Sequence, residues 1–157
     1  MSVEKYSKNE CHKIFAIELN NIVWGLLGKT ERSEDEVNEM INAAHASLYH
    51  WSLIGTELNL QRGEWMCSHV YAVLGRGKSA LYHAERCLMY TEKNSFLDFD
   101  LAYAYESLAR ANAASGNIEE AKDYFEKALK AGNVIKKEED KKLFMSDLNT
   151  GPWYGIL

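Results

Sequence analysis

Residues 101–132 read LAYAYESLARANAASGNIEEAKDYFEKALKAG, and this stretch decides the fold of the chain. Apolar residues recur in it at steps of three and four, before and again after residue 116, which is the period of an amphipathic α-helix. Gly116-Asn117 separates the two patterns, and both residue types tolerate the left-handed backbone that ends a helix. Glu119 and Glu120 follow, where carboxylates favour the start of a helix. The stretch therefore predicts two antiparallel helices joined by a short turn.

A weaker copy of this pattern occupies residues 61–90. In this copy Gly75 stands where Gly116 stands in the later one, and Ala80 stands where Ala121 stands. Repeated helix pairs of this kind bury their apolar faces by stacking on one another. The sequence therefore indicates a row of helix hairpins.

The later copy resembles a tetratricopeptide repeat. The residues that carry the resemblance, in the order and spacing of that family, are Leu108, Ala109, Gly116, Ala121, Phe125 and Ala128. Gly132-Asn133 stands in place of the proline that often closes such a repeat, and the two copies are further apart than the usual 34 or so residues. The resemblance implies an all-α fold of three antiparallel hairpins stacked as a short right-handed superhelix. Small bacterial families built from degenerate repeats are similar in this respect.

The remaining patterns complete the architecture as one domain, residues 1–157. The predicted hairpins cover residues 10–55, 57–93 and 99–131, and residues 1–9 form a loosely held lead-in. In the first helix, the expected buried stripe is Ile14, Ile17, Asn21 and Trp24, with Leu27 or Phe15 as a further member. Ser33 followed by Glu36 matches a capping box at the start of the second helix.

Residues 137–157 are expected to form a helix and tail that cover the last hairpin. An end repeat has no neighbour, so such a helix usually shields its apolar side. The tail contains Trp153 and Tyr154 and is too apolar to remain in water. It either folds back on its own domain or docks on another molecule.

Composition limits the kind of partner and the compartment. The chain of 157 residues has a net charge of −5, and its lysines and arginines are interleaved with acids, which argues against a nucleic-acid partner. No apolar run is long enough for a membrane span, and the N-terminus lacks the apolar core of a signal peptide. Cys11, Cys67 and Cys87 have no paired spacing, and free thiols favour a cytoplasmic location.

Candidate binding residues follow from the predicted stacking, because the first helix of each hairpin lines the concave side. Equivalent positions on that side are Arg62, Trp65, His69, Tyr103, Glu106 and Arg110, with Phe15, Glu18 and Ile22 from the first hairpin. Arginines hold carboxylates through forked hydrogen bonds, and aromatic rings offer flat apolar contact. Glu106 and Arg110 are four residues apart, so they also match an ordinary ion pair on one helix.

The leading prediction is a non-catalytic module that binds a protein or peptide in the concave groove. One alternative is an enzyme that acts on a small molecule or uses a metal, through Arg62, Glu64 and His69. Another is self-assembly, as a homodimer for example, through the end faces and the tail. The sequence lacks a phosphate loop, a nucleophile elbow and HExxH, so no catalytic residue, cofactor or metal site is predicted. The histidines are expected to bond nearby tyrosine, serine or backbone groups, and Cys67 and Cys87 to be buried and inert.

Overall fold

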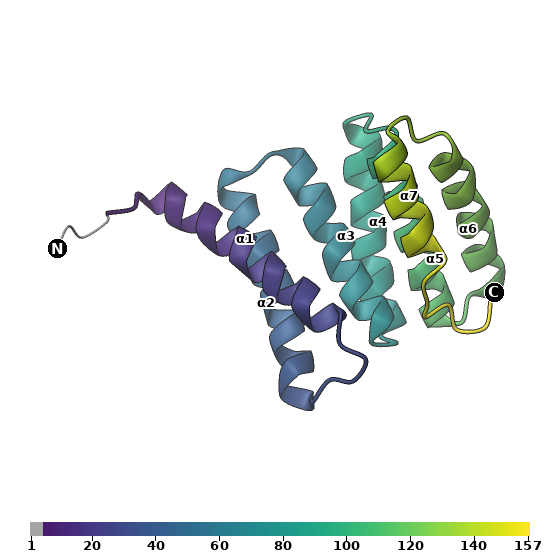
Figure 1. Cartoon of the computed structure of the whole chain (residues 1–157), viewed down its shortest axis with the longest axis horizontal. Helices are drawn as coiled ribbons and strands as arrows, with labels where there is room; N and C mark the ends of the chain where they lie inside the picture. Colours follow the sequence, from purple (N-terminus) through teal and green to yellow (C-terminus); the bar gives the residue numbers. More distant parts are fainter. Residues whose placement is uncertain (1–4) are drawn as a thin grey trace.

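Three helix hairpins and a final single helix make up the protein in the computed structural model, which describes residues 5–157. In chain order the helices are α1 (Lys8–Leu27), α2 (Glu34–Ile54), α3 (Glu57–Val73), α4 (Gly77–Lys93), α5 (Phe99–Ser115), α6 (Ile118–Asn133) and α7 (Glu138–Leu148). Helices pair as α1–α2, α3–α4 and α5–α6, and the pairs stand in a row (Figure 1). The described residues contain no β-strand, which confirms the predicted all-α fold of stacked hairpins. Residues 1–4 of the expected lead-in lie outside the described part of the chain.

Local signals explain where the helices begin and end. Ser33 and Glu36 form the predicted capping box: the Ser33 hydroxyl accepts from the Glu36 backbone N–H at 3.2 Å, and Glu36 Oε2 accepts from the Ser33 N–H at 2.9 Å. Ser7 and Glu10 form the same device at the start of α1. Gly116 ends α5 with a φ of +79°, the left-handed conformation expected from the sequence.

Helix α5 is the centre of the core. It packs against α3, α4, α6 and α7, and every residue from 106 to 113 is buried. Its alanines leave room for neighbouring helices to approach closely, and those that are fully buried or nearly so are Ala102, Ala104, Ala109, Ala111 and Ala113. Few of the remaining buried positions of α5 are apolar, so polar groups must find partners inside the core.

The first hairpin is attached differently from the other two. Helix α2 packs on α3, whereas α1 packs on α2 and lies at an angle to α3 (Figure 1). The buried side chains of α1 are Ala16, Val23 and Leu26. Small Ala16 lets α2 come close enough for the Ser47 hydroxyl to donate to the Ala16 carbonyl at 2.7 Å.

The predicted buried stripe of α1 is therefore wrong. Ile17 and Trp24 are 44% and 45% exposed, Asn21 is exposed, and Ile14 is only partly buried. Apolar residues occur on almost every side of this helix, so their period does not select one face. The small residue at position 16 decides which face approaches α2.

The C-terminal segment folds back on its own domain, as one of the two sequence readings predicts. Helix α7 packs on α5 and α6 and buries Phe144 and Leu148. Trp153 is also buried, and its indole N–H donates to the Leu148 carbonyl at 3.0 Å. The Tyr154 hydroxyl donates to the Ala72 carbonyl of α3 at 2.5 Å. The tail thus joins the third hairpin to the second.

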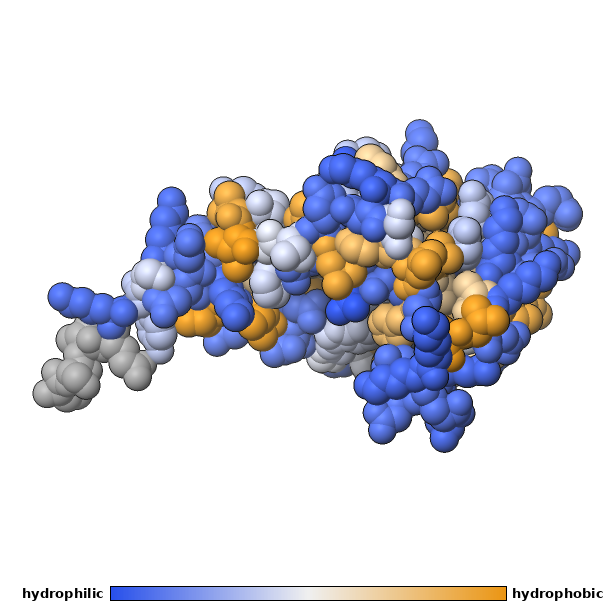
Figure 2. Space-filling view, turned by 90° about the horizontal axis from the view of Figure 1, so that it is seen from above, coloured by the Kyte–Doolittle hydropathy of each residue, from blue (hydrophilic) through white to orange (hydrophobic). Residues whose placement is uncertain are grey.

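The outer surface has no single large apolar face in the view from above. Apolar side chains lie there in separate patches between polar ones (Figure 2). Among the described helices, none carries an apolar stretch that could cross a bilayer.

Gly132 supplies a test of how α7 is seated on α6. A Cβ atom at this position would collide with the ring of fully buried Phe144. We expect Gly132→Ala to lower the free energy of unfolding by about 1–3 kcal/mol, the usual cost of overpacking. Gly25→Ala is the matched control, because nothing lies within 4 Å of its Cβ position and helical Ala gains up to about 1 kcal/mol over Gly. Urea unfolding measures both variants, and equal effects would contradict the packing described.

Candidate functional site

The predicted inner-face residues of α3 and α5 do come together. The Trp65 indole N–H donates to Glu106 Oε2 at 2.9 Å, and the other oxygen of Glu106 accepts from Arg110 Nε. The His69 ring stacks on Trp65 with centroids 4.9 Å apart, and the Tyr103 ring meets Trp65 edge to face at 5.3 Å. Equivalent positions of stacked helices therefore share one surface, as the sequence predicts.

The chain's own C-terminal segment covers this cluster. Arg110 Nη2 donates to the Asp147 backbone carbonyl at 2.5 Å, and the Tyr103 hydroxyl donates to the Asp147 carboxylate at 2.5 Å. The Arg110 guanidinium also lies 4.2 Å from the centre of the Trp153 ring, a cation–π contact. Glu106 and Arg110 are only 0% and 2% exposed. A partner therefore cannot reach these two residues while α7 is in place, which corrects the expectation of an open groove at this point.

Burial shapes the acid–base behaviour of this closed part. It raises the pKa of Tyr103, and the hydrogen bond to Asp147 raises it further. Burial also raises the pKa of Asp147, and negative Glu106 adds to the effect, although the bond from Tyr103 opposes it. Tyr103 therefore remains a neutral donor that holds α7 on α5.

The first hairpin contributes other residues than those predicted. Phe15 is half exposed and its ring lies 5.5 Å from that of His50 on α2, while Glu18 is exposed. Neither lies with Trp65. Helix α1 instead presents Trp24, whose ring stacks on Trp65 at 5.9 Å and 29°. The sequence reading assigned Trp24 to the core, because its position fits an apolar stripe as well as a groove.

An open pocket remains beside the covered cluster, between α1, α3, α5 and α7. Its volume is about 380 Å³, within the range of roughly 300–1,000 Å³ typical of ligand pockets. We call it the groove pocket, and its lining residues are Asn20, Trp24, Gln61, Arg62, Trp65, Met66, Phe99, Asp100, Tyr103, Leu143 and Asp147. Of the predicted binding residues, Arg62, Trp65 and Tyr103 therefore line an accessible cavity.

Polar groups at the groove pocket are few and well placed. Exposed Arg62 holds Asp100 through two hydrogen bonds of 2.9 and 3.3 Å. Gln61 donates through Nε2 to the Thr91 hydroxyl at 3.1 Å, whereas its Oε1 is buried without a partner among the described residues. Aromatic walls with a charged rim suit an apolar ligand group that carries polar ends.

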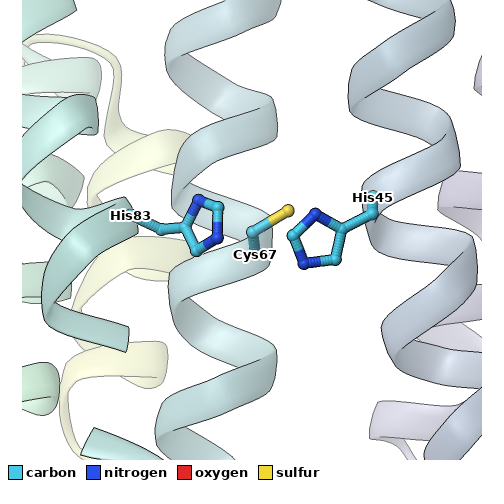
Figure 3. Close-up of side chains that lie close together, drawn as sticks. All are labelled: His45, Cys67 and His83. Atoms are coloured by element: carbon cyan, nitrogen blue, oxygen red, sulfur yellow. The ribbon is translucent and has the colours of Figure 1, made fainter. Parts of the chain in front are cut away.

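A second cluster lies away from the groove pocket. His45 of α2, Cys67 of α3 and His83 of α4 bring their side-chain N and S atoms within 4.8 Å of one another (Figure 3). His45 Nε2 lies 2.9 Å from the Tyr71 hydroxyl, so the predicted tyrosine partner of a histidine is confirmed here. Cys67 is fully buried, as predicted, and burial together with nearby Glu64 raises the pKa of its thiol to about 12.

Glu64 anchors one side of that cluster. It lies 2.6 Å from His83 Nδ1 and accepts from Arg86 Nε at 2.7 Å. Burial acts to raise the pKa of Glu64, but the hydrogen bonds to His83 and Arg86 outweigh it and the pKa is lowered. The sequence predicted no metal site here, because the three residues come from three different helices and leave no spacing motif in the sequence.

The alternative hypothesis of an enzyme uses Arg62, Glu64 and His69, and the side chains of these three residues do not converge on one site. Glu64 is engaged with α4, Arg62 binds Asp100 at the groove pocket, and the His69 ring stacks on Trp65. Side chains two and five residues apart on one helix point in different directions.

No protein-family model, curated protein or solved structure matches this chain. The chemistry of the groove pocket and of the second cluster therefore has to be argued from their own residues.

The covered ion pair gives a stability test. Arg110→Ala would leave the Glu106 carboxylate buried without its charged partner, which typically costs about 3–5 kcal/mol. Arg62→Ala removes a partner from an exposed pair, for which we expect a loss of about 1 kcal/mol or less. Urea unfolding near neutral pH compares the two. Similar losses would mean that Glu106 is not sealed by Arg110 and α7.

His69 gives a pH test. Burial lowers its pKa from the usual 6.5 to about 4, and its Nδ1 is buried without a hydrogen-bond partner among the described residues. Between these values the unfolded chain binds a proton that folded His69 does not, so stability falls as the pH drops through this window. We expect the free energy of unfolding to fall less in His69→Phe than in the wild type between about pH 7 and pH 5. Parallel pH profiles would contradict a neutral, desolvated His69.

Proposed function

We propose that this chain is a non-catalytic recognition module of the tetratricopeptide-like kind, which binds a segment of a partner protein in the groove pocket. The observation that carries the proposal is an uncovered aromatic wall: Trp24 is 45% exposed and stacks on Trp65 inside an open cavity. Large aromatic side chains at the centre of a pocket are the usual anchors of protein recognition.

The part of the inner face that α7 covers supports this proposal, because it already binds a polypeptide segment. There, Arg110 binds a backbone carbonyl of α7, Tyr103 binds a carboxylate, and the guanidinium of Arg110 meets an indole. The same inner surface thus already holds one polypeptide segment through backbone, acidic and aromatic groups. A partner segment entering the groove pocket would meet matching chemistry in Asn20, Trp24 and Arg62.

The size and charge of the site indicate the type of segment. A cavity of about 380 Å³ suits one or two large apolar side chains rather than a whole helix. Arg62 can exchange its bond with Asp100 for a carboxylate of the ligand, because it is exposed and the exchange costs little. We propose a short peptide stretch with an aromatic or aliphatic anchor next to an acidic residue.

The net charge and the cysteines support the proposed kind of partner and the proposed compartment. A net charge of −5 favours a protein partner over nucleic acid. The three cysteines are free, which supports a reducing compartment such as the cytoplasm. The folded-back tail favours a separate partner over a homodimer formed through Trp153.

A displayed random-peptide library tests this function directly. We expect the wild type to select peptides with an apolar anchor beside an acidic residue. Trp24→Ala should weaken binding of the selected peptides about 30-fold or more, because buried tryptophan anchors are commonly worth about 2 kcal/mol or more.

Tyr49→Ala is the matched control, since it removes an exposed aromatic ring of α2 that does not line the groove pocket. Circular dichroism checks that both variants are folded. If no peptides are selected, or if they bind Trp24→Ala as tightly as the wild type, the groove pocket is not a peptide site.

A further inference from the structure

We propose that His45, Cys67 and His83 form a binding site for a zinc ion, separate from the groove pocket. One imidazole comes from each of α2 and α4, and the thiol comes from α3 between them (Figure 3). Nitrogen and sulfur are the donors that Zn²⁺ prefers, at about 2.0–2.1 Å and 2.3 Å. Those bond lengths place ligand atoms roughly 3.5 Å apart around a tetrahedral ion. Atoms already within 4.8 Å of one another need only small side-chain rotations to reach that spacing.

The outer contacts orient both imidazoles toward the sulfur. His83 holds Glu64 through Nδ1 at 2.6 Å, which leaves Nε2 for an ion. His45 holds the Tyr71 hydroxyl through Nε2 at 2.9 Å, which leaves Nδ1, and in Figure 3 this ring points at Cys67. Histidine ligands of zinc almost always carry such a partner on the other nitrogen, and a carboxylate is a common choice.

The buried acid is itself fixed. Glu64 is 3% exposed and its second oxygen accepts from Arg86 Nε at 2.7 Å. The contacts of Glu64 with His83 and Arg86 would by themselves explain why Glu64 is buried and why Arg86 lies beside it. They would not account for the approach of a second histidine and a fully buried thiol to His83, with one possible ligand atom of each residue within 4.8 Å of the others. A metal ion accounts for all of them.

Solvent can reach the His83 side of the cluster. A shallow depression of about 240 Å³ opens beside it, lined by Tyr71, Lys78, Ser79, Tyr82 and His83. Of the three ligands only His83 lines it, so an ion would enter beside His83, where there is also room for a water molecule as the fourth ligand. On binding, the Cys67 sulfur coordinates as the thiolate and its proton passes to solvent, so each zinc ion taken up releases one proton.

Spectroscopy with Co²⁺ as a zinc substitute tests the site on the full-length chain after treatment with a chelator. We expect one equivalent of Co²⁺ to give a thiolate-to-cobalt charge-transfer band and the visible bands of tetrahedral Co²⁺, and one equivalent of Zn²⁺ to abolish both. Bound zinc should also raise the Tm, because the ligands join α2 to α3 and α4.

Matched variants assign the ligands. Cys67→Ala should abolish the charge-transfer band, whereas Cys87→Ala should keep it, because Cys87 is equally buried but lies outside the cluster. His45→Gln should weaken Zn²⁺ binding by more than the roughly 10–100-fold that loss of an outer hydrogen-bond partner costs, and Glu64→Gln should weaken it within that range. Circular dichroism establishes that each variant is folded.

Three outcomes would overturn the proposal. The first is no charge-transfer band and no binding of either metal to the wild type. The second is a band that persists in folded Cys67→Ala. The third is metal binding that is unchanged in Cys67→Ala and lost in His50→Gln, because His12 and His50 lie with their Nδ1 atoms 2.8 Å apart and are the competing location.

Discussion

The buried ion pair between Glu106 and Arg110 is the constraint on which the rest of the structure depends. Two charges in a core are tolerated only if nearly all their hydrogen bonds are made. The Trp65 indole N–H donates to the Glu106 carboxylate. Arg110 donates to the backbone carbonyl of Asp147, and its guanidinium makes a cation–π contact with the Trp153 ring. Helices α3, α5 and α7 and the C-terminal tail are thereby joined through one pair of side chains.

That constraint divides the inner surface of the hairpin stack into two parts. The part on the third hairpin is closed, because α7 and Trp153 cover the pair. Arg110 Nη1 is the one nitrogen of the pair that is buried without a hydrogen-bond partner among the described residues. The part facing the first hairpin stays open, because α1 lies at an angle to α3 and reaches it through the stacked rings of Trp24 and Trp65. The proposed recognition function uses the open part, and the closed part shows which groups this surface can hold.

Sequence patterns predict most of the fold but only part of the site. Helices and turns follow from local signals such as the Ser33 capping box and Gly116, and those signals act within a few residues. Stacking equivalent helices correctly predicts that Trp65, His69 and Glu106 lie together. The position at which the final helix packs depends on contacts between residues far apart in the sequence. The covering of Arg110 by α7 could therefore not be predicted from local patterns. The same holds for His45, Cys67 and His83, whose meeting depends on how three helices are offset.

The one-sided attachment of the first hairpin has a thermodynamic consequence. Helix α2 is its main contact with α3, and both the cavity at Trp24 and the cluster of His45 and Cys67 take residues from the first and the second hairpin. If two ligands each favour a particular angle between these two hairpins, each changes the affinity of the other, and the two changes are equal. A zinc ion bound at Cys67 would thus change the affinity for a peptide at Trp24, and the bound peptide would change the affinity for zinc by the same factor. The joint between α2 and α3 makes this small chain a candidate for allosteric coupling without any change in its secondary structure.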